Sequence, residues 1–237
     1  MAPLKPLSVR SALLAPLSGA KRLLGDKELA TLAALPVLVT LVSYSAVIAV
    51  AALTADDLVG ALWAKPAGAW LVLWYLAVAV LFFAELLVLR GIFFAVTGII
   101  AGPLYERVAK RVLSERGLAL AEAGILDGLK ATLWRFLLFV LPSIGFGLLG
   151  LIPGVGLALF LPLSLTFSAF AFAGEVLEAP LALLGLKAGE RLRFVLTNRL
   201  ACWALGVVLA LALYVPFLVL LAVPAAVVGL SEQVERA

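Results

Sequence analysis

Four long apolar stretches dominate this chain, at residues 29–55, 67–104, 136–174 and 200–231. Each approaches or exceeds the ~20 apolar residues that a helix needs to cross a hydrocarbon core. Backbone inside a bilayer must satisfy its hydrogen bonds within helices or a closed barrel. Runs such as LVLWYLAVAVLFFAELLVL lack the alternation of barrel strands. The pattern therefore predicts an all-α integral membrane protein that folds as a single membrane domain over residues 1–237.

The first two stretches predict two full membrane spans. Residues 29–55 form the first span, and the second runs from residue 67 to about Arg90. As a helix the stretch 67–104 would be about 57 Å long, nearly twice the ~30 Å hydrocarbon core. Its later part must therefore leave the membrane, and we expect it to continue as a cytoplasmic helix over residues 104–117. Before the first span, residues 8–24 have the periodicity of an amphipathic helix at the interface.

Prolines and glycines break the last two stretches into short arms. Residues 136–174 hold 39 positions without a charge and are interrupted at Pro153, and residues 200–231 are interrupted at Pro216. The resulting arms of roughly 13 to 18 residues are shorter than a comfortable span. Paired apolar segments that proline interrupts are typical of half-inserted helices around a site in the bilayer. We predict two such half-inserted hairpins, and six ordinary short spans are the alternative.

Composition and charge agree with a membrane protein and indicate its orientation. Of 237 residues 65% are hydrophobic and 14% are charged, and the mean hydropathy is +1.20. Lys and Arg number five in residues 1–31, six in 105–135 and four in 187–199, against one in the connector 54–66. The positive-inside rule places the basic segments and both termini in the cytoplasm. Because these basic residues alternate with acids and flank membrane segments, we expect no nucleic-acid partner.

The residues needed for most catalytic and metal chemistry are missing. The chain has no histidine and one cysteine, Cys202, which excludes the usual zinc, haem and His-dependent catalytic arrangements. Neither the G-x-x-x-x-G-K-[ST] phosphate loop nor the G-x-S-x-G nucleophile elbow occurs. We therefore predict a protein that is not an enzyme, with no catalytic residue, no metal site and no cofactor.

Two charged residues inside the second apolar stretch are candidates for function. Glu85 and Arg90 lie in FFAELLVLRGIFF, and ionisable groups within a membrane are costly and commonly functional. Five positions apart, they do not share a helical face, which favours separate partners. The alternative is that Arg90 extends to the cytoplasmic interface and Glu85 meets another basic side chain.

Further charges flank the predicted hairpins. Glu175 and Glu178 are three positions apart on one helical face, where they would hold a cation or pair with Arg191 or Arg193. Guanidinium groups also suit an oxyanion, which they hold with two parallel hydrogen bonds; contact with lipid headgroups is the alternative. The anion-binding candidates are Lys21, Arg22, Arg90 and Arg199. The gating or ion-pair candidates are Glu85, Glu175, Glu178, Arg191 and Arg193.

The order of several short motifs resembles a known family. IAGPLYERVAKRVL, LIPGVG, FSAFAFAGEVLEAPLALLGLKAGERLRFVLTNR and PFLVLLAVPAAVVG together resemble the CysZ-type sulfate permeases and the wider family of etoposide-induced protein 2.4, over residues 17–235. The resemblance implies a bacterial inner-membrane protein with two full spans and two pairs of half-inserted helices. It further implies an oligomer that passes sulfate inward for cysteine synthesis, with the bilayer and the anion as partners.

The chain departs from these permeases at one motif. A Gly-Leu-Arg-Arg type sequence before the first span is associated with sulfate binding in the family, and the aligned residues here are Glu28, Leu29, Ala30 and Thr31. Because the arginines are absent and Glu28 would repel a dianion, no binding residue is carried over from that motif.

Two hypotheses follow. The first is an oligomeric permease for a small inorganic anion, with sulfate the leading candidate, in which Arg22, Arg90 and Arg199 attract the anion and Glu85 orients an arginine or gates the path. The second is a non-transporting membrane scaffold, whose half-inserted helices shape lipid or hold a partner protein. The abundant Gly and Ala, which allow close helix contact, support the second. An intramembrane enzyme is the least favoured class.

Overall fold

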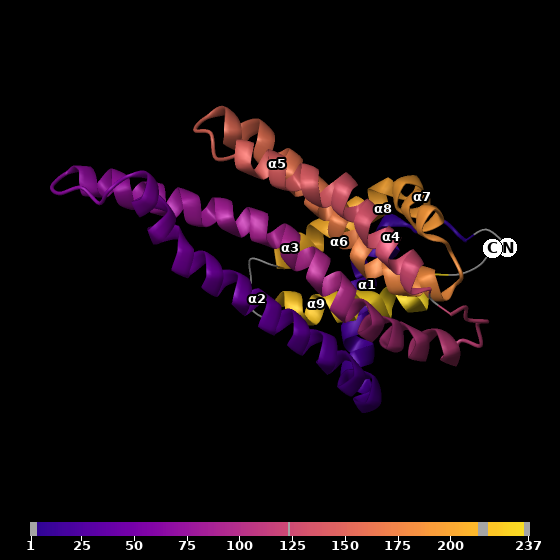
Figure 1. Cartoon of the computed structure of the whole chain (residues 1–237). Helices are drawn as coiled ribbons and strands as arrows, with labels where there is room; N and C mark the ends of the chain where they lie inside the picture. The colour runs from indigo at the N-terminus through magenta and orange to yellow at the C-terminus, as the bar shows by residue number, and fades with distance from the viewer. Residues whose placement is uncertain (1–3, 123, 213–217, 235–237) are drawn as a thin grey trace.

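The computed structural model describes residues 4–122, 124–212 and 218–234, and its regular elements in these ranges are helices. The all-α prediction is confirmed (Figure 1). The α-helices are α1 (Val9–Gly25), α2 (Lys27–Leu62), α3 (Trp70–Glu115), α4 (Ile125–Arg135), α5 (Leu141–Leu149), α6 (Leu161–Leu183), α7 (Ala188–Thr197), α8 (Arg199–Ala212) and α9 (Leu218–Gln233). Two π-helical segments are η1 (Phe136–Val140) and η2 (Gly156–Phe160).

The amphipathic helix α1 packs against α9 through small residues. Its buried positions are Ala12, Ala15 and Gly19. A Cβ placed on Gly19 would lie 1.8 Å from the carbonyl oxygen of Ala225, and one on Gly229 would lie 2.0 Å from that of Ala15. The two backbones therefore touch, as small residues spaced four apart allow in membrane proteins. The leucines of α1 at positions 13, 17 and 24 are exposed on its other side.

Helices α2 and α3 run side by side as a long arm that leaves the rest of the molecule (Figure 1). They contain 36 and 46 residues, so each extends beyond the span that the sequence predicts. Helix α3 continues without a break from the predicted span into the predicted helix 104–117, over about 69 Å. At the tip, the Trp74 indole donates a 3.0 Å hydrogen bond to the carbonyl of Trp63, and the Lys65 ammonium lies 4.7 Å from the Trp74 ring centroid.

The first hairpin comprises α4, η1 and α5 in one arm and η2 and α6 in the other. Its arms are longer than predicted, because the helices continue past both ends of the uncharged stretch. Segments Leu126–Leu149 and Ala158–Leu183 contain 24 and 26 residues, each long and apolar enough to cross a membrane. Gly154 adopts a φ of +80° in the turn between them, a conformation that glycine adopts without steric cost. Whether the hairpin spans or half-inserts stays a prediction.

The second hairpin comprises α8 and α9, of 14 and 16 residues. The break predicted at Pro216 lies outside the described residues. Helices α7 and α8 meet at an angle of 91°. The described residues contain three helices that are long and apolar enough to cross a membrane, or up to four if this bent pair counts as one span.

The core lies where α6 packs against α8, α9 and the later part of α3. The leucines Leu113, Leu181, Leu205 and Leu230 are fully buried there. In contrast, the α2–α3 arm exposes large apolar side chains, such as Leu53 at 74% and Val72 at 72%. Apolar surface of this kind is expected where a helix faces lipid, and the chain is an integral membrane protein.

Candidate functional site

Closure of the first hairpin brings together two charges that bound the uncharged stretch. Arg135 is the last residue of α4, and Glu175 lies in α6 on the other arm. Because the arms are antiparallel, the two side chains meet, with Nη2 of Arg135 3.2 Å from Oε2 of Glu175. Gly174 leaves the necessary space, since a Cβ there would lie 2.8 Å from Cδ of Arg135. The guanidinium also donates to the Thr132 hydroxyl at 3.2 Å.

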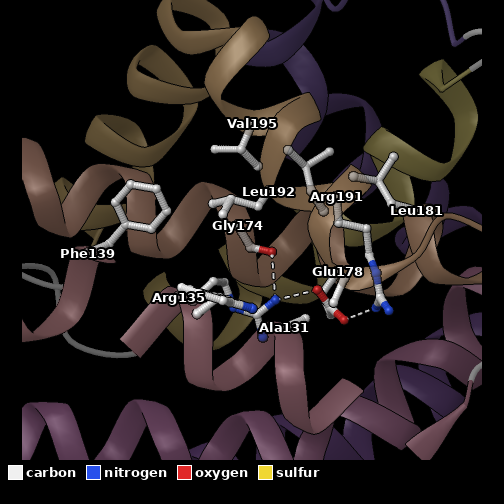
Figure 2. A pocket seen from close by; sticks show the side chains of 12 residues that line it. Ala131, Arg135, Phe139, Gly174, Glu178, Leu181, Arg191, Leu192 and Val195 are labelled. Carbon is white, nitrogen blue, oxygen red and sulfur yellow. Dashed lines mark hydrogen bonds and ion pairs between the residues drawn. The ribbon is translucent and has the colours of Figure 1, made fainter. Parts of the chain in front are cut away.

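A second carboxylate lies between two arginines (Figure 2). Glu178, one helical turn beyond Glu175, accepts from Nη1 of Arg135 through Oε2. Its other oxygen, Oε1, accepts from Nη1 of Arg191, which α7 supplies. The side chains of all four residues are only 6 to 15% exposed. We call Arg135, Glu175, Glu178 and Arg191 the buried charge cluster.

The buried charge cluster has an unused donor beside a small cavity. Nε of Arg191 is buried and has no hydrogen-bond partner in the described part of the chain. Arg135, Arg191 and the Phe139 ring line a cavity of about 20 Å³, enough for a water molecule. A sulfate ion is larger than a water molecule and does not fit this cavity. In this structure the two guanidinium groups are paired with the carboxylates of Glu175 and Glu178.

A third carboxylate lies near the cluster. Glu106 of α3 is half-buried, and this burial raises the pKa of its carboxyl. The charge of Glu178 raises that pKa further, while Arg191 opposes the shift. Because the folded protein favours the neutral acid, Glu106 contributes stability below its ordinary pKa of 4.5, and that contribution is lost as the pH rises through the raised value.

This shift gives a testable pH dependence. Replacing Glu106 by Gln is expected to raise the melting temperature at neutral pH, because a neutral side chain then replaces a carboxylate that burial disfavours. The melting temperatures of the two proteins should converge as the pH falls toward 4.5. Melting curves in detergent at several pH values check this. The control is Glu122→Gln, which removes a carboxylate that is exposed to solvent. A constant difference at every pH would contradict it.

The predicted ion-pair residues are brought together in part. Glu175 and Glu178 lie in the cluster, and the predicted pairing with Arg191 is confirmed. Arg193 instead lies exposed on α7. Arg135 was missed because the sequence presents it as one of many basic residues beside a membrane segment. One signal in the sequence does identify Arg135: it directly precedes the uncharged stretch 136–174, and Glu175 directly follows that stretch.

The described contacts do not join the predicted anion-binding residues to the cluster. Arg22 pairs with Glu115 at 2.5 Å and lies 4.0 Å from Glu232. Lys21 and Arg199 are exposed. The side chain of Arg90 lies outside the described part of the chain. A role for these four residues in anion binding stays a prediction.

Two acidic positions singled out by the sequence have described partners. Glu28 lies 3.1 Å from the Arg111 guanidinium, so its charge is balanced at the surface. Glu85 accepts a 2.9 Å hydrogen bond from the Thr54 hydroxyl across the α2–α3 arm. Its Oε1 is buried without a hydrogen bond in the described residues, and the side chain lines a groove of about 470 Å³.

The fold and the cluster define a helical integral membrane protein with ion pairs buried between its hairpin arms. A sequence profile of the family described as sulfate transporter CysZ/etoposide-induced protein 2.4 matches residues 15–224. The chain belongs to this family, which confirms the resemblance seen in the motifs. A search of curated proteins found no match.

Proposed function

We propose that the chain is a membrane permease for a small inorganic anion, with sulfate the leading substrate. The observation that carries this is the Glu178 carboxylate, held between the buried guanidinium groups of Arg135 and Arg191. Sulfate presents pairs of oxygens to arginine in the same geometry as a carboxylate does. The family description, which names sulfate transport, supports the same substrate.

In this proposal the anion replaces Glu178. Two positive groups in a poorly hydrated site need a negative partner, because a buried unpaired charge is strongly unfavourable. Glu178 supplies that partner when the site is empty of substrate. Entering sulfate displaces its carboxylate and takes over the hydrogen bonds from Arg191, including the unused Nε donor. Arg135 retains Glu175 during this exchange.

The proposal extends to the cellular setting. The basic segments support a cytoplasmic location for both termini. From the resemblance of its motifs to the CysZ-type permeases, we extend the proposal to a bacterial cytoplasmic membrane, a homo-oligomer and a supply of sulfate for cysteine synthesis. As a permease the protein is not expected to be an enzyme.

Uptake of radiolabelled sulfate by liposomes that contain the purified protein tests the proposal. The expected result is saturable uptake above that of empty liposomes, blocked by excess selenate and much less by chloride. Selenate competes because it has the charge and tetrahedral shape of sulfate. Absence of uptake by a folded protein would contradict sulfate transport.

A non-transporting scaffold is the second candidate. The observation that favours it is the exposed apolar side of α1, with Leu17 at 62% and Leu24 at 89% exposure, together with the missing arginine motif. This candidate predicts that purification from native membranes returns one stoichiometric partner protein and no anion flux.

A further inference from the structure

Three buried hydroxyl groups lie between the arms of the first hairpin. Ser143 of α5 and Ser164 and Ser168 of α6 are each at most 2% exposed. The Ser143 and Ser168 hydroxyls lie 2.7 Å apart, and the Ser164 hydroxyl donates to the Ser143 carbonyl at 2.7 Å. We call these three residues the hydroxyl cluster.

Helix α6 connects the hydroxyl cluster to the buried charge cluster along one face. Ser164, Ser168, Ala171, Glu175 and Glu178 follow one another at spacings of four, three, four and three residues. Residues at these spacings share a helical face. Over 14 residues the face extends about 21 Å along the helix, a large part of a hydrocarbon core of ~30 Å.

The Ser164 and Ser143 hydroxyls bond across the hairpin, while the Ser168 hydroxyl, which contacts Ser143, also donates to the Ser164 carbonyl of its own helix at 2.8 Å. Thr166 donates to the carbonyl of Pro162 four positions before it, within its own helix. Such a bond alone would satisfy a serine at the hairpin interface. The Ser164 hydroxyl instead donates across to the other arm. The three serines therefore place several donors and acceptors at one level between the two helices.

One aromatic side chain lies between the two clusters along the other arm. Phe139 follows Arg135 by four residues and precedes Ser143 by four. Its ring lines the cavity beside Arg135 and stacks on Phe170 at 5.6 Å between centroids. It belongs to the π-helical segment η1, and π-helical turns are frequent at functional sites.

We propose that the inner face of the first hairpin carries the anion onward from the buried charge cluster to the hydroxyl cluster, with Phe139 as the barrier between them. This inference rests on the proposed function and extends it with the three serines of the hydroxyl cluster as positioning residues. Two features point toward an anion. Arg191, which is 95% buried and whose Nε has no partner in the described part of the chain, lines the cavity at the cluster end. The serine hydroxyls can rotate to offer hydrogen-bond donors to a passing anion, and these donors replace the hydration water that the anion has lost.

Cysteine accessibility tests this path without relying on flux alone. In a Cys202→Ser background, which removes the single native thiol, Ser168→Cys is treated with a negatively charged, membrane-impermeant methanethiosulfonate reagent in reconstituted protein. We expect modification at Ser168→Cys that is slowed by sulfate and that blocks sulfate uptake. Thr166→Cys, on the opposite face of α6, is the matched control and should not react. Ser164→Cys provides a second position should Ser168→Cys fold poorly.

Flux measurements on conservative variants complement the labelling. Ser168→Ala should lower the initial rate of sulfate uptake by about tenfold or more, since a hydrogen bond to a charged group is lost, and Ser168→Thr should restore most of it. Absence of labelling at both serine positions, in proteins that still transport sulfate, would overturn the path. Failure of the unmodified protein to transport sulfate would instead contradict the proposed function, so the two failures are distinct.

Discussion

Replacing Arg191 by alanine is expected to destabilise the protein by about 3–5 kcal/mol, because it leaves a buried carboxylate without one of its partners. Glu178 would keep only its contact with Arg135, which also serves Glu175. The expected observation is a large fall in melting temperature in detergent. Arg193→Ala is the matched control on the same helix, and as an exposed substitution it should change stability by no more than about 0.5 kcal/mol.

A double substitution separates lost charge pairing from lost packing. Arg191→Met combined with Glu178→Met removes both charges, so no buried group is left unpaired. Replacement of a buried ion pair by apolar residues is often neutral or stabilising. The double variant should therefore melt well above Arg191→Ala alone. Equal melting temperatures for Arg191→Ala and Arg193→Ala would contradict the assignment of Arg191 to the cluster.

Replacing Gly206 by alanine is expected to separate α8 from α6. A Cβ at position 206 would lie 1.8 Å from the carbonyl oxygen of Ala169, and neither backbone can yield without moving a helix. Overpacking in a well-packed core costs about 1–3 kcal/mol and sometimes more, and this contact lies at the severe end of that range. Thermal melting, with tryptic digestion as a second readout, measures the loss.

Gly60→Ala is the control for the glycine substitution. Gly60 lies in helix α2 with no atom within 4 Å of an added Cβ. Alanine there should stabilise the protein by about 0.4–1 kcal/mol, because it restricts the unfolded chain. A Gly206→Ala protein that melts with or above wild type would contradict the close α6–α8 packing.

The elements that the sequence predicts well are those whose signal is local. The interface helix predicted at residues 8–24 is α1, Val9–Gly25, because its alternation of apolar and basic positions needs no knowledge of the fold. The family likewise follows from the order of short motifs along the chain.

The arm lengths could not be predicted from apolar run length. The sequence argument ended each arm of the first hairpin at a charged residue, since single charges are costly in a membrane. In the structure Arg135 and Glu175 neutralise each other across the hairpin, so the helices continue through them. A charge ends an apolar run but not the helix that contains it, and ion-pair partners 40 positions apart are not visible locally.

The candidate site shows the same limit. The spacing of Glu175 and Glu178 was sufficient to predict a shared face and an arginine partner. The choice of Arg191 over Arg193 depends on which side of α7 packs on α6, and that is set by tertiary contacts. The hydroxyl of Thr54 as the partner of Glu85, 31 positions away, depends on the register between α2 and α3.

The most direct test of the anion-binding role of the cluster is sulfate uptake by liposomes containing Arg191→Gln combined with Glu178→Gln, compared with wild type and with Arg193→Gln. The double variant keeps the side-chain volumes similar and leaves no charge of the pair unbalanced, so it should fold. We predict that it loses most sulfate uptake while Arg193→Gln retains it. Wild-type uptake by a folded double variant would contradict the proposal that sulfate displaces Glu178 and binds to Arg191.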